Sequence, residues 1–280
     1  MAHARFAKVA VVILGFAIFA ACSGGAEPTT SEAPSTSRAG TEHVATATGD
    51  LFLPSDRSTA PLLVLVPGGA WRTADPTGLV DLAAALADAG MVTMTTTVRA
   101  AEDGVAYPAP IEDVLCAVAT AAEAATAHGV DIGPVVLFGH STGAHLAALA
   151  ALSPERYDPL CSADPPPVDA LIGVSGTYDV DAMPEIAIDL FGVAPTEAPE
   201  LWQEGNAVLA ASLRPDLPVL LVHGEADQLV PMAFTKGFAD ALSRGGHAVT
   251  VVTVPGADHH TIYRPETVAD AITAWVGDLG

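Results

Sequence analysis

Basic side chains are scarce in this sequence. Its 280 residues include 11 Lys and Arg, only two of them Lys, against 33 Asp and Glu, and the formal net charge is −22 at pH 7. A chain with so few cations lacks the positive surface that binds phosphate backbones or anionic lipid headgroups. We therefore expect neither a nucleic acid partner nor electrostatic docking to an anionic membrane.

Cysteine is also rare, with three residues in the chain. No C-x-x-C pair and no His-rich cluster is present, so the sequence offers no metal site. Cys22 lies at the end of an N-terminal apolar run, which leaves Cys116 and Cys161 as an even pair. In an oxidising compartment these two cysteines could form a disulfide, and two buried free thiols are the open alternative.

The N-terminal apolar run covers residues 9–21, and its 13 residues are too few to cross a bilayer comfortably. A basic segment precedes it, which is typical of an export signal over residues 1–22. The run ends at Ala20-Ala21-Cys22-Ser23, which resembles a bacterial lipobox with Cys22 as the lipidated residue. An ordinary signal peptide cut nearby is the alternative.

The segment after the apolar run, residues 23–40, is rich in Ser, Thr and Pro. Such a segment buries too little apolar surface to offset the entropy lost on ordering, so we expect a flexible tether. Residues 41–280 then form one domain. We expect an exported protein that is anchored to the outer face of the membrane by lipid on Cys22, or secreted.

Within residues 41–280, apolar β-branched runs alternate with helix-forming segments. The pattern predicts strands over 62–66, 91–98, 135–138, 168–174, 219–222 and 248–254, and helices over 79–89, 111–128, 232–242 and 267–276. Residues 44–53 could form a leading hairpin. Strands that are near-continuous apolar runs, each followed by a helix, predict an α/β fold with a mostly parallel sheet covered on both faces. Residues 179–214 lack a strand pattern and are expected to form a small cap.

The pentapeptide Gly139-His140-Ser141-Thr142-Gly143 reads G-x-S-x-G. An apolar run precedes it and a helix-forming run follows it, so a strand, a sharp turn and a helix meet at Ser141. This is the setting of a nucleophile elbow, in which glycines let the turn tighten and expose the serine Oγ above the sheet. Ser141 is therefore the candidate nucleophile.

Functional groups of a parallel sheet lie on the loops that leave the carboxyl ends of its strands. Asp227 follows the expected strand at 219–222, and His259 follows the one at 248–254. Their chain order after Ser141 predicts a Ser-His-Asp triad with His259 as base and Asp227 as the residue that orients it. His260 is the rival base, while His140 and His145 are interpreted as packing or pocket-wall residues.

An oxyanion needs backbone N–H donors close to the nucleophile. One is expected from Thr142, the residue after the candidate nucleophile. The others are expected from Gly69 and Ala70, in the glycine-containing loop that follows the expected strand at 62–66. The predicted oxyanion hole thus consists of Gly69, Ala70 and Thr142.

With these motifs the chain resembles the α/β-hydrolase superfamily, in particular its esterase, hormone-sensitive-lipase-like and kynurenine-formamidase-like group. The resemblance covers residue 62 to the C-terminus and includes Pro67-Gly68-Gly69-Ala70-Trp71, where the group has His-Gly-Gly-x-Trp. Ser175-Gly176-Thr177-Tyr178-Asp179 and the loops around Asp227 and His259 also match. Pro67 departs from the group's pattern because proline cannot donate the hydrogen bond that histidine gives the oxyanion loop.

The resemblance implies an α/β-hydrolase fold and hydrolysis of a small-molecule carboxylic ester through an acyl-enzyme, with no metal and no cofactor. An amidase or formamidase on the same machinery and an inactive hydrolase-fold binding lipoprotein remain alternatives. Four aromatic residues could line a substrate pocket, although core packing is the competing interpretation of each: Trp71, Phe191, Trp202 and Tyr263. The oligomeric state is not indicated by the sequence.

Overall fold

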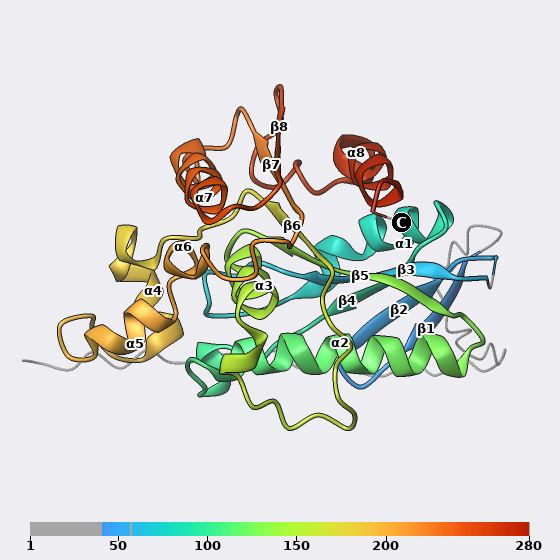
Figure 1. Cartoon of the computed structure of the whole chain (residues 1–280), viewed down its shortest axis with the longest axis horizontal. Helices are drawn as coiled ribbons and strands as arrows, with labels where there is room; N and C mark the ends of the chain where they lie inside the picture. Colours follow the sequence, from blue (N-terminus) through green and yellow to red (C-terminus); the bar gives the residue numbers. More distant parts are fainter. Residues whose placement is uncertain (1–40, 57, 280) are drawn as a thin grey trace, which may run out of the picture. The chain divides into compact units, whose positions relative to one another are not determined.

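A computed structural model describes residues 41–56 and 58–279. Within them an eight-stranded sheet has the order β1-β2-β4-β3-β5-β6-β7-β8, with β3 to β8 parallel and β1 and β2 antiparallel (Figure 1). The strands are β1 (Glu42–Ala45), β2 (Gly49–Leu53), β3 (Ala60–Val66), β4 (Val92–Thr96), β5 (Ile132–His140), β6 (Ala170–Val174), β7 (Val219–Gly224) and β8 (Val249–Val254). The leading hairpin and the mostly parallel sheet are thus as predicted.

Helices connect these strands. The α-helices are α1 (Val80–Asp88), α2 (Ala109–Ala127), α3 (Thr142–Leu152), α4 (Pro184–Phe191), α5 (Pro199–Glu204), α6 (Ala207–Ala210), α7 (Met232–Gly245) and α8 (Pro265–Gly277). Short 3-10 helices are η1 (Pro76–Leu79), η2 (Ala101–Asp103), η3 (Pro154–Arg156) and η4 (Val180–Ala182). No helix in the described part of the chain combines the length and the apolar character needed to cross a membrane.

The alternating side chains of each strand pack into two cores, one on each face of the sheet. In β3, Leu62 and Val64 belong to the core beneath α2 and α3, whereas Leu63 and Leu65 belong to the core beneath α1 and α8. Figure 1 shows these two helix pairs on opposite sides of the sheet. Because strand side chains alternate between faces, an uninterrupted apolar run fills both cores.

The segment between β6 and β7 folds as a succession of short helices, η4, α4, α5 and α6. It contains no strand, as the lack of a strand pattern at 179–214 predicted. Met183 and Ile186, at the start of this segment, contribute to the wall of the pocket that contains Ser141. The segment therefore acts as a cap at one side of that pocket.

Two predicted segments, the export signal at 1–22 and the tether at 23–40, lie outside the described residues, and so does Cys22. The cysteines within the described range, Cys116 in α2 and Cys161 in the loop before β6, are joined by a disulfide with an S–S distance of 2.07 Å. It ties the long helix under the sheet to the connection that follows α3.

Candidate active site

Ser141 lies at a sharp turn between β5 and α3. Its backbone has φ 54° and ψ −124°, a conformation that non-glycine residues rarely adopt and that persists only when the surroundings impose it. The neighbouring glycines explain how the turn fits. A Cβ on Gly139 would lie 2.4 Å from Ala144 Cα, and one on Gly143 would lie 2.3 Å from the Pro67 carbonyl oxygen. The motif therefore has glycine where a side chain would collide with backbone.

Asp227 and His259 meet at the carboxyl ends of β7 and β8. The His259 Nδ1 lies 2.8 Å from Asp227 Oδ2, and the Asp227 carboxylate is fully buried. Asp227 Oδ1 accepts the N–H groups of Leu229 and Val230 at 2.9 Å each. Burial raises the pKa of Asp227, but hydrogen bonds from Val230 and His259 outweigh it, so the pKa lies below its usual range. An ionised carboxylate there selects the tautomer with the proton on Nδ1, which leaves Nε2 as the free acceptor.

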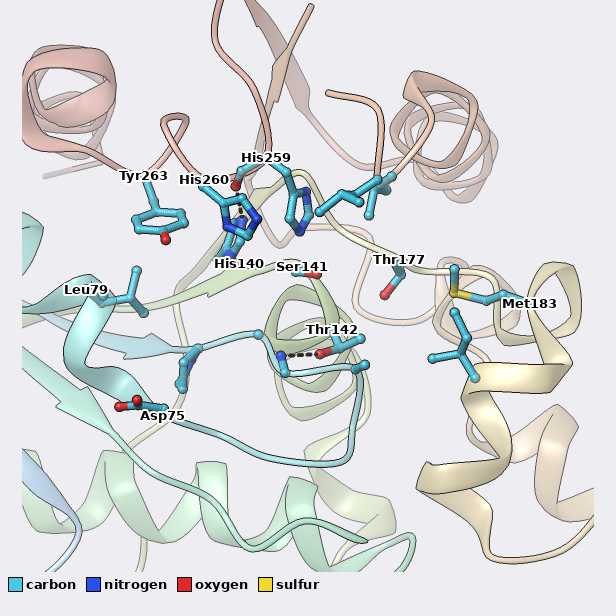
Figure 2. A pocket seen from close by; sticks show the side chains of 18 residues that line it. Asp75, Leu79, His140, Ser141, Thr142, Thr177, Met183, His259, His260 and Tyr263 are labelled. Atoms are coloured by element: carbon cyan, nitrogen blue, oxygen red, sulfur yellow. Dashed lines mark hydrogen bonds between the residues drawn. The ribbon is translucent and has the colours of Figure 1, made fainter. Parts of the chain in front are cut away.

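The rings of His259 and His260 lie edge to face, with centroids 5.6 Å apart. Both residues line the pocket that contains Ser141, but of these two histidines it is His259 whose ring bonds to Asp227. Figure 2 shows the His259 ring on the side of the pocket where Ser141 lies. No hydrogen bond joins the Ser141 hydroxyl to either ring within the described residues, and such contacts commonly tighten only when substrate is bound.

His140 supports the loop that carries His259. Its Nε2 donates to the His259 carbonyl oxygen at 2.9 Å, and its ring lies 4.6 Å from the His259 ring and 4.5 Å from the Tyr263 ring. Burial, and then the charge of His259, lower the pKa of His140 to about 3. Because its ring is neutral and already donates to a backbone carbonyl, His140 is a packing residue rather than a base.

The loop after β3 brings backbone N–H groups toward Ser141. A Cβ on Gly68 would lie 2.7 Å from Ser141 Cβ, so only glycine allows this approach. The Gly69 N–H donates to Thr142 Oγ1 at 3.2 Å (Figure 2). The N–H of Thr142 begins α3 and has no acceptor within that helix. The N–H of Ala70 has no partner within the described residues, so Ala70 and Thr142 provide the uncommitted donors.

The pocket has a volume of about 490 Å³. Tyr263 and His260 line one part of it, and the exposed side chains of Ile186 and Leu229 contribute to its apolar wall. Further lining residues that the sequence did not point to are Leu79, Thr177, Met183 and Val230. Aliphatic side chains in a cap or beside a catalytic loop carry no distinguishing pattern. Leu229 and Val230 could have been inferred only from their closeness to Asp227 in the chain.

Three of the four aromatic residues predicted to line the pocket pack in the core instead. Phe191 and Trp202 stack with ring centroids 4.4 Å apart, and the Trp202 indole donates to the Val193 carbonyl at 2.9 Å. Trp71 is buried, and its indole donates to His145 Nδ1 at 3.3 Å. Trp71, Phe191 and Trp202 thus pack against core partners and do not line the pocket that contains Ser141, whereas Tyr263 does line it.

A protein-family model described as BD-FAE matches residues 50–242. The chain belongs to the BD-FAE family. It is 29% identical over 235 residues to Esterase LipQ and 30% identical over 217 residues to Esterase LipC, both of Mycobacterium tuberculosis. These alignments cover 78% and 71% of this chain and 55% and 53% of the relatives. The chain thus spans about half the length of the curated relatives that it matches.

Solved structures share the architecture of this BD-FAE chain. A truncated carbohydrate esterase from gut microbiota has a TM-score of 0.69 at 20% identity and covers 82% of this chain and 90% of its own. A thermophilic esterase from Thermogutta terrifontis has a TM-score of 0.63 at 22% identity, over 86% of this chain and 91% of its own. These likenesses confirm the predicted α/β-hydrolase fold.

Asp227 bonds to His259 and to backbone N–H groups, and His140 bonds to a backbone carbonyl. Within residues 41–56 and 58–279 no group of three or more His, Cys, Asp or Glu side chains is arranged to hold a metal ion. The chemistry that the described side chains themselves offer is nucleophilic attack assisted by a base.

Proposed function

We propose that this BD-FAE chain is a serine hydrolase that cleaves carboxylic esters through an acyl-enzyme on Ser141. The observation that supports this most directly is the 2.8 Å contact between His259 and Asp227, in the wall of the pocket that also contains the strained Ser141 turn. The names of the relatives, which are esterases, support an ester as the bond that is cleaved.

In the first half-reaction Ser141 Oγ attacks the ester carbonyl carbon while His259 Nε2 takes the hydroxyl proton. The carbonyl oxygen becomes an oxyanion, which the N–H groups of Ala70 and Thr142 would stabilise. The bond to the alcohol oxygen then breaks, and the protonated His259 gives its proton to the departing alcohol. Asp227 holds the ring in the required tautomer and stabilises its charged form.

In the second half-reaction a water molecule attacks the acyl carbon and gives a proton to His259. The bond to Ser141 Oγ breaks, the proton returns to Ser141, and the carboxylic acid leaves. Every proton is therefore accounted for by one imidazole, and the cycle ends with the chain in its starting state.

The pocket suits a small-molecule ester. Its volume of about 490 Å³ lies within the range of about 300–1,000 Å³ found for small-ligand sites. Met183, Ile186 and Leu229 offer an aliphatic wall, and Tyr263 and His260 offer an aromatic one. We propose that the apolar part of the substrate lies against these side chains.

The test combines covalent labelling with turnover. We expect a fluorophosphonate probe to label the wild-type chain but not Ser141→Ala. We expect Asp227→Asn and His259→Ala to reduce kcat for p-nitrophenyl acetate by about 1,000-fold or more. The matched variant His260→Ala removes part of the pocket wall but not the bond to Asp227, so it should raise KM while lowering kcat by less than about tenfold. Loss of activity in His260→Ala with full activity in His259→Ala would overturn the assignment of the base.

An amidase or formamidase would use the same residues and the same steps. Comparing kcat/KM for matched ester and formamide substrates separates the two reactions. Labelling of neither the wild type nor Ser141→Ala would favour the third alternative, an inactive scaffold that only binds, and would overturn the hydrolase proposal.

We also propose that residues 41–280 act outside the cell, after export directed by 1–22 and on a tether formed by 23–40. Only the sequence supports this proposal: the apolar run, the lipobox-like end at Cys22 and the composition of the tether. Metabolic labelling with a fatty acid analogue should mark the wild type and not Cys22→Ala. Equal labelling of the two, or none of either, would contradict lipidation at Cys22.

A further inference from the structure

His145 lies in α3, four residues beyond Ser141, and is completely buried. Its Nδ1 accepts the indole N–H of Trp71 at 3.3 Å, and its Nε2 donates to the Gly205 carbonyl oxygen at 2.8 Å. Burial lowers the pKa of His145 to about 4, so the ring is neutral near pH 7 and has one donor and one acceptor. Each ring nitrogen therefore has one partner, and the two partners lie in different parts of the fold.

The first partner, Trp71, belongs to the loop that carries the uncommitted N–H of Ala70. Ala70 and Trp71 have φ values of 56° and 57°, in the left-handed region, which costs roughly 1–2 kcal/mol per non-glycine residue. Two consecutive strained residues need contacts that hold them. The Trp71 carbonyl accepts the Ala101 N–H at 3.1 Å, and the indole ring meets the His145 ring edge to face with centroids 5.3 Å apart.

The second partner, Gly205, belongs to the cap. It follows α5 and packs so closely against Phe191 of α4 that a Cβ there would lie 2.6 Å from the Phe191 ring. The carbonyl that His145 holds is thus part of the packed interior of the cap rather than of a free loop. One imidazole side chain connects the nucleophile helix, the oxyanion loop and the cap.

We propose that His145 is a positioning residue that holds the oxyanion loop in its strained conformation through Trp71 and fixes it to the cap through Gly205. This inference rests on the hydrolase function proposed above. An oxyanion donor acts only when it lies within about 2.7–3.1 Å of the developing charge, so a small shift of Ala70 weakens stabilisation of the transition state. Ground-state binding depends on the pocket wall, which His145 does not form.

The test uses three variants. His145→Leu removes both bonds, Trp71→Phe removes only the indole donor, and His145→Gln retains a donor and an acceptor. We expect kcat for p-nitrophenyl acetate to fall by about 10- to 100-fold in His145→Leu with KM within about threefold, by a smaller factor in Trp71→Phe, and to recover partly in His145→Gln. Rates are expressed per folded molecule.

The matched control is His247→Leu. His247 is also buried and bonds a backbone carbonyl, that of Leu217 at 2.9 Å, but it does not line the pocket. The His247→Leu variant should be less stable than the wild type but keep the same kcat. A His145→Leu variant that behaves like His247→Leu would overturn the proposal. If His145→Leu does not fold, an unchanged kcat in both Trp71→Phe and His145→Gln would overturn it equally.

A second readout does not depend on turnover. The indole N–H of Trp71, assigned by its disappearance in Trp71→Phe, should exchange slowly with solvent deuterium in the wild type, at least about tenfold faster in His145→Leu, and at an intermediate rate in His145→Gln. Unchanged exchange would contradict the inferred hydrogen bond. A wild type that is inactive and unlabelled at Ser141 refutes the hydrolase function instead, and this exchange measurement still decides whether His145 holds the loop.

Discussion

Acidification should destabilise the protein through its buried neutral histidines. Burial depresses the pKa of His145 to about 4, and burial followed by the charge of His259 depresses that of His140 to about 3. In the unfolded chain a histidine has a pKa of about 6.5. Below about pH 6.5 the unfolded state therefore binds protons that the folded state does not bind. The stability that the two neutral histidines contribute is complete above about pH 6.5 and is lost as the pH falls toward the folded pKa values.

The size of the effect follows from linkage. One pKa unit corresponds to about 1.36 kcal/mol, so at about pH 5 each of these histidines contributes roughly 2 kcal/mol less than at about pH 7.5. Both folded pKa values lie below about 5, so neither histidine is mostly protonated in the folded state at about pH 5. The size of the loss therefore depends on the unfolded pKa and on the chosen pH. The excess negative charge of the chain acts in the opposite direction, because protonation relieves self-repulsion. That contribution is common to wild type and variants and cancels in their difference.

The assay is urea unfolding, followed by far-ultraviolet circular dichroism, of the wild type, His145→Gln and the double variant with His140→Gln. Between about pH 7.5 and about pH 5 the wild type should lose roughly 2 kcal/mol more free energy of unfolding than His145→Gln, and roughly 4 more than the double variant. Parallel losses in all three proteins, with equal m-values, would refute the reasoning.

Two further predictions concern the elbow and the disulfide. Gly143→Ala should lower the free energy of unfolding by about 3 kcal/mol or more and reduce ester turnover, because its methyl would lie 2.3 Å from the Pro67 carbonyl oxygen. The control Gly237→Ala, which has nothing within 4 Å, should be neutral or slightly stabilising. Thermal unfolding measures both. The double variant Cys116→Ala/Cys161→Ala opens a loop of sequence separation 45 and should lose about 4 kcal/mol in urea unfolding. Loss of under about 1 kcal/mol would mean that the disulfide constrains little of the unfolded chain.

The sheet and the candidate triad were accessible from sequence for one physical reason. Parallel strands are apolar on both faces, so they appear as unbroken runs, and their carboxyl ends share one edge of the sheet. The sequence alone therefore predicts that Ser141, Asp227 and His259 lie near one another. The ends of strands were harder to predict. β5 begins at Ile132, three residues before the predicted start, and continues past Pro134. Its register with β3 shifts there, between Ala60 and Leu62. Pro134 has no N–H to give to the ladder, so the strand signal is weak at this position.

The pocket wall could not be predicted in the same way. Phe191 and Trp202 lie in a helical segment, where a large aromatic side chain fits a core and a binding site equally well, and they stack on each other in the core. The aliphatic Met183 and Ile186 line the pocket instead. The role of His145 was equally inaccessible, because its partners lie 74 and 60 residues away in the chain.

A second contact, besides that of His145, joins the loop of the proposed oxyanion donors to the cap, and the burial of the two contacts predicts which contributes more. Arg72, next to Trp71, meets Asp189 of α4 at 3.1 Å, but its side chain is 61% exposed, and exposed ion pairs contribute about 0–1 kcal/mol. The bond from His145 to Gly205 lies in the interior, where removing one partner leaves a buried polar group unpaired at a cost of about 1–3 kcal/mol. Arg72→Gln should therefore change kcat by less than about threefold in a p-nitrophenyl acetate assay, and high salt should change it as little. A loss as large as that of His145→Leu would mean that the surface ion pair positions the donors as much as the buried imidazole does, and would refute this ranking.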